Sequence, residues 1–455
     1  MHIDITERKL AEQELERIAY QDPLTGLWSR QGLGRALAAR FEHTGWQPGA
    51  RVVMLNLRHQ RDVNDAHGYA IGDQVLIEVA HRLVERAGDG ALVARPGGDE
   101  FAVFLPAHAG PGRDRRVAAI AATFDQPIEL EHFSVDAGAQ FGVTLLGERE
   151  RPPEELMREA AVALFHGRDG RQRSAWNEYS PEIDRERQER VELTRDLQRA
   201  LANDEFQLHF QPKVRLADGG QLVAAEALLR WHHPERGLQS PATFIPIAEQ
   251  SQLIAPIGDW VLREACSFLR EWRRAGLDIV RIAINVSLVQ FTVGDFVSSV
   301  RAALDAYAVP PSSLTLEITE SVFEQESDEL YRQLHALHEL GVQLSLDDFG
   351  TGYSSLLYLQ RYPFDEIKID QAFVRNILDD DYSRRIVNTV LGLCGALGAE
   401  PIAEGIESEA VRDALLELGC RVGQGFHYSM PLEAEDFRWL LEQGTALPLS
   451  GSGAP

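Results

Sequence analysis

Two adjacent carboxylates, Asp347 and Asp348, end an apolar strand-like run, and the stretch Gly350-Thr351-Gly352 follows them closely. In an extended chain neighbouring side chains point to opposite sides, so these aspartates are expected to reach different ions. Carboxylate oxygens suit hard divalent cations such as Mg²⁺ and Mn²⁺. An isolated Asp-Asp pair is more often a solvated turn. The metal-binding interpretation therefore depends on what the rest of the chain places beside the pair.

The C-terminal half of the chain predicts a barrel around this pair. Eight strand-like runs occur at 207–212, 223–229, 281–286, 314–318, 343–346, 366–369, 400–403 and 420–425. Helical periodicity separates most of them, as in 260–275, 328–340 and 384–397. This alternation predicts an irregular (β/α)₈ barrel, because the first two runs follow each other without a helix.

Polar residues fall at the carboxyl ends of these predicted strands, where barrels of this type carry their active sites. They are Glu226, Asn285, Glu317, Asp347, Asp348, Lys368, Asp370, Glu404 and Gln424. Each has an ordinary structural explanation by itself, but six of them are carboxylates, which cannot all stay ionised at close range without compensation. One lysine does not balance them. Two divalent cations would, and ions about 3.5–4 Å apart are the usual device for cleaving a phosphodiester.

The motifs of this half resemble the EAL domain, a family of cyclic di-GMP phosphodiesterases. The matching segments are Glu226-Ala227-Leu228, 283–287 around Asn285, 316–321 around Glu317, 347–352, Lys368-Ile369-Asp370, 403–407 around Glu404, and Gln424-Gly425-Phe426. They extend over the whole predicted barrel. The resemblance implies hydrolysis of cyclic di-GMP to linear pGpG with two cations, Mg²⁺ or Mn²⁺.

The resemblance also implies a role for each residue of the site. One metal would be held by Glu226, Asn285, Glu317 and Asp347, and the second by Asp347, Asp348 and Asp370, completed by Glu404 and Gln424. Lys368 would orient or help deprotonate the attacking water, and Glu320 would tether the loop that begins at Asp348. Gln211, Arg230, Glu407 and Phe426 would contact the dinucleotide, Arg230 through a phosphate.

Residues 21–175 predict a separate α/β or α+β unit around one sheet. Strand-like runs lie at 51–57, 91–95, 101–105 and 140–146, and helical patterns at 31–41, 72–86 and 153–165. Gly97-Gly98-Asp99-Glu100 predicts a hairpin tip. Together with 22–27, these motifs resemble the GGDEF domain, a nucleotide-cyclase-like mixed sheet flanked by helices that condenses GTP into cyclic di-GMP. By this resemblance the GTP-binding residues are Asn64, Asp73, Gly97, Gly98, Asp99 and Glu100.

This first unit departs from the GGDEF pattern at the strand before Asn64. The family usually ends that strand in Asp-x-Asp, but this chain has Asn56 and Arg58 there. An amide lacks the charge that helps to hold Mg²⁺. We therefore expect a degenerate unit, with GTP as a candidate allosteric ligand of the phosphodiesterase. Two alternatives stay open: a bifunctional enzyme with residual cyclase activity, and a non-catalytic module that senses cyclic di-GMP.

Composition narrows the class of protein. With 455 residues the chain should form two or three domains. The net charge of −25, from 45 basic and 70 acidic residues, argues against a nucleic acid polymer as partner. The three cysteines form no metal-spacing motif, which favours reduced thiols in a cytoplasmic protein. No apolar run is long enough to cross a membrane.

The predicted organisation has three further segments. Residues 1–20 predict a signalling helix that resembles the tail following a PAS sensor, so the chain is expected to be a fragment of a longer sensor, with a membrane-attached sensor as one alternative. Residues 176–203 predict an interdomain helix, residues 204–445 the EAL domain, and residues 446–455 a flexible tail. By resemblance to EAL domains, a homodimer is expected.

Overall fold

The computed structural model describes residues 17, 19–58, 60–107, 113–130, 134–166, 176–217, 220–277, 281–324, 327–350, 359 and 361–443. The chain divides into two units, Met1–Glu189 and Arg190–Pro455, which are described separately. The predicted tail, nearly all of the predicted signalling helix and the last two residues of the Asp347–Gly352 motif lie outside the described residues. Within the described part, no helix is both long and apolar enough to cross a membrane.

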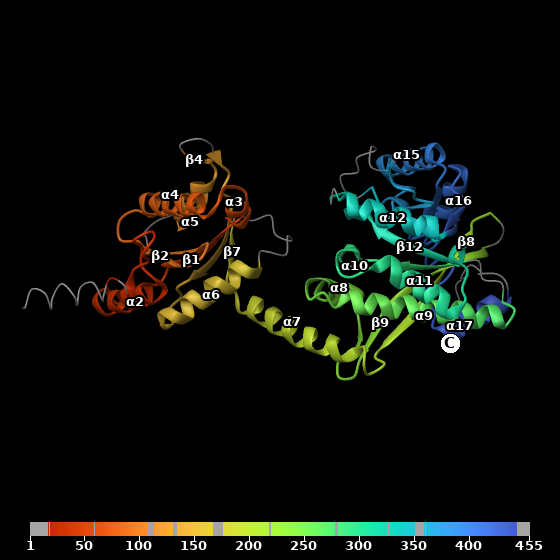
Figure 1. Cartoon of the computed structure of the whole chain (residues 1–455), viewed down its shortest axis with the longest axis horizontal. Helices are drawn as coiled ribbons and strands as arrows, with labels where there is room; N and C mark the ends of the chain where they lie inside the picture. Colours follow the sequence, from red (N-terminus) through yellow and green to blue (C-terminus); the bar gives the residue numbers. More distant parts are fainter. Residues whose placement is uncertain are drawn as a thin grey trace, which may run out of the picture. The chain divides into compact units, whose positions relative to one another are not determined.

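The first unit is built on a five-stranded mixed sheet in the order β2-β3-β1-β6-β7 (Figure 1). These strands are β1 (Arg51–Leu57), β2 (Leu92–Gly97), β3 (Glu100–Leu105), β6 (Ala139–Leu145) and β7 (Asn177–Glu178). β1 pairs antiparallel with β3 and β6, whereas β6 and β7 are parallel. A separate two-stranded hairpin joins β4 (Ile128–Glu129) and β5 (Ser134–Val135).

Alternation along β1 explains why helices cover both faces of this sheet. Val53 and Leu55 pack in one core with α4 (Tyr69–Ala87) and α5 (Arg113–Ala121). Val52 and Met54 pack in another with α2 (Arg30–Thr44) and α6 (Pro153–His166). Because both faces are buried, the strand is a continuous apolar run. The short polar helix α3 (Gln60–His67) and helix α5 were not predicted.

The second unit is a closed barrel of eight strands, as predicted. They are β8 (Phe206–Arg215), β9 (Gln221–His233), β11 (Ile282–Asn285), β12 (Leu314–Thr319), β13 (Gln343–Phe349), β14 (Glu366–Ile369), β15 (Glu400–Ala403) and β16 (Val422–Gly423). β8 closes the barrel between β9 and β16 and is antiparallel to both, while the other neighbours are parallel. The irregularity expected at the first two strands is therefore confirmed. β10 (Gly237–Gln239) extends β9 outside the barrel.

Helices surround the barrel, and their apolar faces form one core with the strands. They are α8 (Pro241–Gln250), α9 (Ile254–Arg274), α10 (Leu288–Thr292), α11 (Phe296–Tyr307), α12 (Asp328–Leu340), α14 (Gln371–Arg375), α15 (Asp381–Leu397), α16 (Glu409–Glu417) and α17 (Ala434–Gln443). Helix α7 (Pro181–Ala200) spans the boundary between the units, within the predicted interdomain helix. Cys266, Cys394 and Cys420 are buried and unpaired.

Candidate functional site

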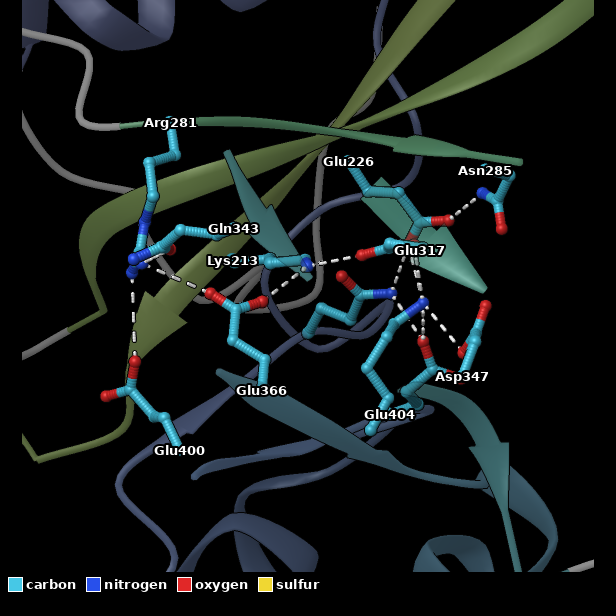
Figure 2. Close-up of polar contacts among 12 residues, drawn as sticks. Lys213, Glu226, Arg281, Asn285, Glu317, Gln343, Asp347, Glu366, Glu400 and Glu404 are labelled. Atoms are coloured by element: carbon cyan, nitrogen blue, oxygen red, sulfur yellow. Dashed lines mark hydrogen bonds and ion pairs between the residues drawn. The ribbon is translucent and has the colours of Figure 1, made fainter. Parts of the chain in front are cut away.

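A buried lysine joins carboxylates from the ends of four other strands at the carboxyl end of the barrel. Lys368 comes from β14 and is 1% exposed. Its Nζ lies 2.7 Å from Glu404 Oε1, 2.8 Å from Glu317 Oε2, 2.9 Å from Asp347 Oδ1 and 3.4 Å from Glu226 Oε2. Figure 2 shows the four carboxylates, Glu226, Glu317, Asp347 and Glu404, gathered around one centre. The barrel thus brings together residues that are far apart in the sequence.

Two amides fix the orientation of Glu226 within this cluster. Asn285 Nδ2 donates to Glu226 Oε1 at 2.8 Å. Gln424 Nε2 donates to Glu226 Oε2 at 2.7 Å and to Glu404 Oε1 at 3.0 Å. The other amide atom, Gln424 Oε1, is buried without a hydrogen-bond partner among the described residues. A buried acceptor of this kind fits a cation or a cation-bound water.

The carboxylates of the two adjacent aspartates lie on the same side of the site, whereas a regular strand would direct them to opposite sides. The register of β13 shifts between Leu346 and Phe349, and Asp348 has a φ of 55°. Carboxylate oxygens of Asp347, Asp348 and Glu404 consequently lie within 4.8 Å of one another. A bulge re-aims the side chain that regular alternation would direct away. Three carboxylates this close form a donor set suited to a hard divalent cation.

Lys368 and Glu226 form the charged centre of the cluster. Burial by itself lowers the pKa of Lys368, but the surrounding carboxylates raise it well above its usual value. Burial by itself raises the pKa of Glu226, but attraction to Lys368 and Lys213 and the amide hydrogen bonds bring it to about 2. Lys368 is therefore an ammonium that donates hydrogen bonds, which favours orienting a water over removing a proton from it.

Three of the other carboxylates, Glu404, Glu317 and Asp348, have raised pKa values because they are crowded. Burial and repulsion from neighbouring carboxylates raise the pKa of Glu404 to about 8, against the attraction of Lys368. The same two causes raise the pKa of Glu317 to about 7 and that of Asp348 to about 6. Without cations the cluster therefore holds protons near neutral pH. Divalent cations would replace these protons, since metal ligands bind in the deprotonated form.

Two further predicted residues make contacts with backbone groups at the edge of the cluster. Asp370 caps α14, and its Oδ1 accepts from Ala372 N at 2.7 Å. Buried Glu320 accepts from Gly350 N at 3.1 Å through Oε2. Glu320 thus contacts the chain two residues beyond Asp348. The residues that follow, 351–358, lie outside the described part.

The predicted dinucleotide-binding residues surround the cluster less closely. Gln211 on β8 pairs with Glu226 in the strand register, and its Nε2 donates to Ser429 O at 3.3 Å. Arg230 lies on the same strand as Glu226, four residues closer to its carboxyl end. Glu407 is exposed and pairs with Arg375 Nε at 2.8 Å. A further predicted contact, Phe426, is a large aromatic side chain that is 49% exposed.

The sequence interpretation counted one lysine among the acids and missed a second, buried one. Lys213 on β8 is 1% exposed, and its Nζ lies 2.5 Å from Glu317 Oε1 (Figure 2). A signal was available: Gln211 and Lys213 are two residues apart on one strand, so both side chains face the barrel interior. With Lys213 included, the acids at this end of the barrel still outnumber the lysines.

In the first unit, the hairpin predicted at Gly97-Gly98-Asp99-Glu100 joins β2 to β3. Gly97 and Gly98 have positive φ angles, and nothing lies within 4 Å of a Cβ placed on either. Asn56 pairs directly with Glu100, so the residue that replaces the usual aspartate does lie beside the hairpin.

Asn64 lies on α3, and Asp73 follows Gly72 on α4. A Cβ on Gly72 would meet Asn64 Oδ1 at 1.8 Å, so a larger residue at this position would displace the Asn64 side chain. Asn64 Oδ1 is buried without a hydrogen-bond partner among the described residues. This acceptor packs against Gly72.

Two family models match the chain, and their matches follow one another. The model described as "Diguanylate cyclase, GGDEF domain" matches residues 19–173, and the EAL domain model matches residues 194–431, more than half of the chain. The chain belongs to the GGDEF–EAL family. The family resemblance inferred from the motifs is thereby confirmed.

Relatives and solved structures agree with this assignment. The chain is 37% identical over 426 residues to the bifunctional diguanylate cyclase/cyclic di-GMP phosphodiesterase MucR of Pseudomonas aeruginosa, covering 93% of this chain and 62% of MucR. It is 32% identical to the cyclic di-GMP phosphodiesterase PdeR of Escherichia coli, covering 96% of this chain and 65% of PdeR. The chain thus spans less than two thirds of these relatives.

A solved structure of the PaMucR phosphodiesterase in complex with c-di-GMP is 44% identical to the part of this chain that it matches. It covers 54% of this chain and 99% of its own, with a TM-score of 0.52. A structure of the EAL enzyme Bd1971 with cAMP and cyclic di-GMP is 28% identical, covering 77% of this chain and 92% of its own, with a TM-score of 0.54.

Proposed function

We propose that the EAL unit of this chain hydrolyses cyclic di-GMP to linear pGpG with two divalent cations, Mg²⁺ or Mn²⁺. The observation that carries the proposal is the donor set around Lys368, in which carboxylates and amides from six barrel strands meet within hydrogen-bond distance of one another. The 44% identity to a phosphodiesterase solved with c-di-GMP supports the choice of substrate.

The residues present fit a pair of cations. We assign Glu226, Asn285, Glu317 and Asp347 to one, and Asp347, Asp348 and Asp370 to the other, with Glu404 and Gln424 completing the set. The raised pKa values of Glu404, Glu317 and Asp348 support this assignment, because the excess negative charge needs compensation. When bound, the cations supply a reactive water near neutral pH and neutralise the phosphate.

The protein side chains bind and orient the reactants. Arg230 holds a phosphate of the dinucleotide, Gln211 contacts the ligand beside Glu226, Glu407 accepts from a guanine edge, and Phe426 covers a base. Lys368 donates a hydrogen bond that orients the water for attack on phosphorus. The P–O3′ bond breaks, the water oxygen becomes part of the 5′-phosphate, and the 3′-oxygen leaves with a proton.

The experiment is a turnover assay of the full chain with cyclic di-GMP and Mg²⁺ or Mn²⁺, followed by separation of the nucleotides. We expect pGpG, its loss on chelation of the metal, and its loss in Glu226→Ala. Tight binding of cyclic di-GMP without any pGpG would instead indicate the sensor class of EAL protein.

For the GGDEF unit we propose a regulatory role with GTP as its ligand, bound through Asn64, Asp73 and the hairpin Gly97-Gly98-Asp99-Glu100. The buried, unpartnered Oδ1 of Asn64 and the open backbone at the two hairpin glycines support nucleotide binding. Regulation is tested by titrating GTP into the phosphodiesterase assay. Unchanged kcat and KM at saturating GTP would exclude regulation of the phosphodiesterase by GTP.

Residual cyclase activity is a second candidate, because Asn56 lies directly beside Glu100 in the strand register. Its test is incubation of Glu226→Ala with GTP and Mg²⁺, since that variant cannot degrade the product. Accumulating cyclic di-GMP would establish a bifunctional enzyme.

We further propose a cytoplasmic homodimer with the GGDEF domain over 21–175, the linking helix over 176–203 and the EAL domain over 204–445.

A further inference from the structure

Glu317 is held by a different lysine on each of its oxygens. Lys368 Nζ lies 2.8 Å from Oε2, and Lys213 Nζ lies 2.5 Å from Oε1. All three side chains are at most 1% exposed. Lys368 comes from β14 and Lys213 from β8, so the carboxylate of β12 is fixed between two other strands of the barrel. Figure 2 shows Lys213 approaching Glu317 from the side of Glu366 and Arg281.

The charge of Lys213 is compensated one layer deeper in the barrel. Glu366 Oε2 lies 3.7 Å from Lys213 Nζ, and Glu366 Oε1 lies 3.3 Å from Arg281 Nη1. Arg281 also hydrogen-bonds Gln343 and lies 3.7 Å from Glu400. The two positive side chains, Lys213 and Arg281, balance the two carboxylates, Glu366 and Glu400, so this layer carries no net charge. Glu317 is therefore not needed to compensate Lys213, and its charge stays available to the site.

The contact lengths separate the roles of Glu366 and Glu317 toward Lys213. The 3.7 Å separation to Glu366 is too long for a hydrogen bond, and Glu366 Oε2 has no hydrogen-bond partner among the described residues. The 2.5 Å contact to Glu317 is a charge-assisted hydrogen bond. Lys213 is thus directed toward Glu317 and receives mainly long-range compensation from Glu366.

We infer that Lys213 is a positioning residue: by holding Oε1 of Glu317 it turns Oε2, the oxygen that contacts Lys368, toward the predicted cations. This inference rests on the proposed two-cation site. Oε2 faces Lys368 and the other ligands, so monodentate ligation through it keeps the carboxylate in register with Glu226 and Asp347. Partners behind a ligating carboxylate orient it, and their loss typically costs about 10–100-fold in metal affinity or activity.

A purely structural role makes a different prediction. Replacing a buried ion pair with apolar residues of similar volume is often neutral for stability, whereas deleting one partner is destabilising. Lys213→Met should therefore lower the unfolding temperature of the full chain. Lys213→Met combined with Glu366→Leu should recover part of it, because Arg281 keeps its contacts with Gln343 and Glu400. Glu317 lacks its Oε1 donor in both variants.

The decisive readout is Mn²⁺ affinity, measured by titration of the full chain without dinucleotide. We expect both variants to bind Mn²⁺ at least about tenfold more weakly than the parent, even where the double variant regains stability. Deleting a nearby positive charge would by Coulomb's law alone strengthen cation binding, so the expected direction opposes the simple electrostatic one. The matched control is Arg281→Met, which removes a barrel cation that does not contact Glu317 and should change Mn²⁺ affinity by no more than about threefold.

The outcomes separate this inference from the proposed function. A parent that hydrolyses cyclic di-GMP, together with a double variant of parental or higher Mn²⁺ affinity, overturns the role of Lys213 alone. An equal loss of affinity in Arg281→Met also overturns it, because the effect would then be general to the barrel interior. A parent that binds no Mn²⁺ and produces no pGpG overturns the proposed function itself.

Discussion

Glu320 accepts a hydrogen bond from the backbone N–H of Gly350, with 3.1 Å between Oε2 and N. Gly350 has a φ of +104°, a conformation that favours glycine, and a Cβ there would meet Phe373 at 3.0 Å. The contact therefore anchors the chain immediately after the Asp347–Asp348 pair. It lies directly after the end of β13, the strand that carries the pair.

This anchor predicts that Glu320→Ala lowers kcat by about 10–100-fold although Glu320 is not assigned to substrate. The carboxylate of Asp348 would lose its fixed position, and Gly350 N would lose its acceptor. The measurement is steady-state hydrolysis of cyclic di-GMP at saturating metal. Glu320→Gln keeps an acceptor oxygen and should retain most of the activity. Equal losses in both variants would contradict an anchoring role.

Removal of either central ligand should abolish turnover while the fold survives. In Asp347→Asn and Glu226→Gln a neutral amide replaces a carboxylate that pairs with Lys368, so the cation loses a charged ligand. We expect kcat to fall by more than about 100-fold, beyond the cost of losing a supporting contact. Circular dichroism checks that the fold persists. Near-parental kcat in a folded variant would show that the ligand assignment is wrong.

Metal-free protein should become less stable as pH rises from about 5 to about 8.5. The folded-state pKa values of Asp348, Glu317 and Glu404 are raised to about 6, 7 and 8, above their ordinary values in the unfolded chain. The folded state then holds more protons than the unfolded state, so stability present at low pH is lost through this window. The lowered pKa of Glu226, about 2, acts at more acidic pH.

Thermal unfolding of the full chain in a chelator, across this pH range, tests the prediction. Saturating Mg²⁺ should remove most of the decline, because the cations replace the protons. Glu404→Gln should reduce the slope, since it deletes the carboxyl with the highest of these pKa values. An unfolding temperature that rises with pH in the absence of metal would contradict the account.

Asn64→Ala should weaken GTP binding by about tenfold without lowering the unfolding temperature. The amide Oδ1 is buried and unpartnered among the described residues, so its removal costs a ligand contact and no hydrogen bond that the structure records. Calorimetry of the full chain with GTP measures the affinity. The Glu226→Ala background prevents turnover of any product. Parental affinity in Asn64→Ala would exclude this residue from GTP recognition.

The barrel was predictable because each buried parallel strand is a short apolar run that ends in a polar residue. Leu344-Ser345-Leu346-Asp347 shows this pattern, and the structure places Asp347 at the strand end, beside Lys368. The hairpin was also predictable from neighbouring residues, because Gly97 and Gly98 supply the positive φ angles that the turn needs. Signals of this kind depend on few neighbours and survive in a single sequence.

The contacts that the sequence did not reveal depend on tertiary structure. Burial of Lys213 is possible only because Glu317 and Glu366, from two distant strands, meet it inside the barrel. The bulge that turns Asp347 and Asp348 to one side arises from the register of β13 against β14. Neither the contacts of Lys213 nor the bulge in β13 is marked in the sequence by a periodic pattern or a motif. Local patterns predicted which polar residues follow the strands, and the barrel determines which of them touch.

The central claim is that the acidic cluster holds two divalent cations together with the dinucleotide. Anomalous diffraction from crystals of the full chain grown with Mn²⁺ and cyclic di-GMP tests it most directly. We predict two peaks in each EAL unit, one beside Glu226 and Asp347 and one beside Asp347 and Asp348, with Lys368 displaced from at least one carboxylate. Clear density for the dinucleotide with no anomalous peak, and with the carboxylates still paired to Lys368 and Lys213, would contradict the account.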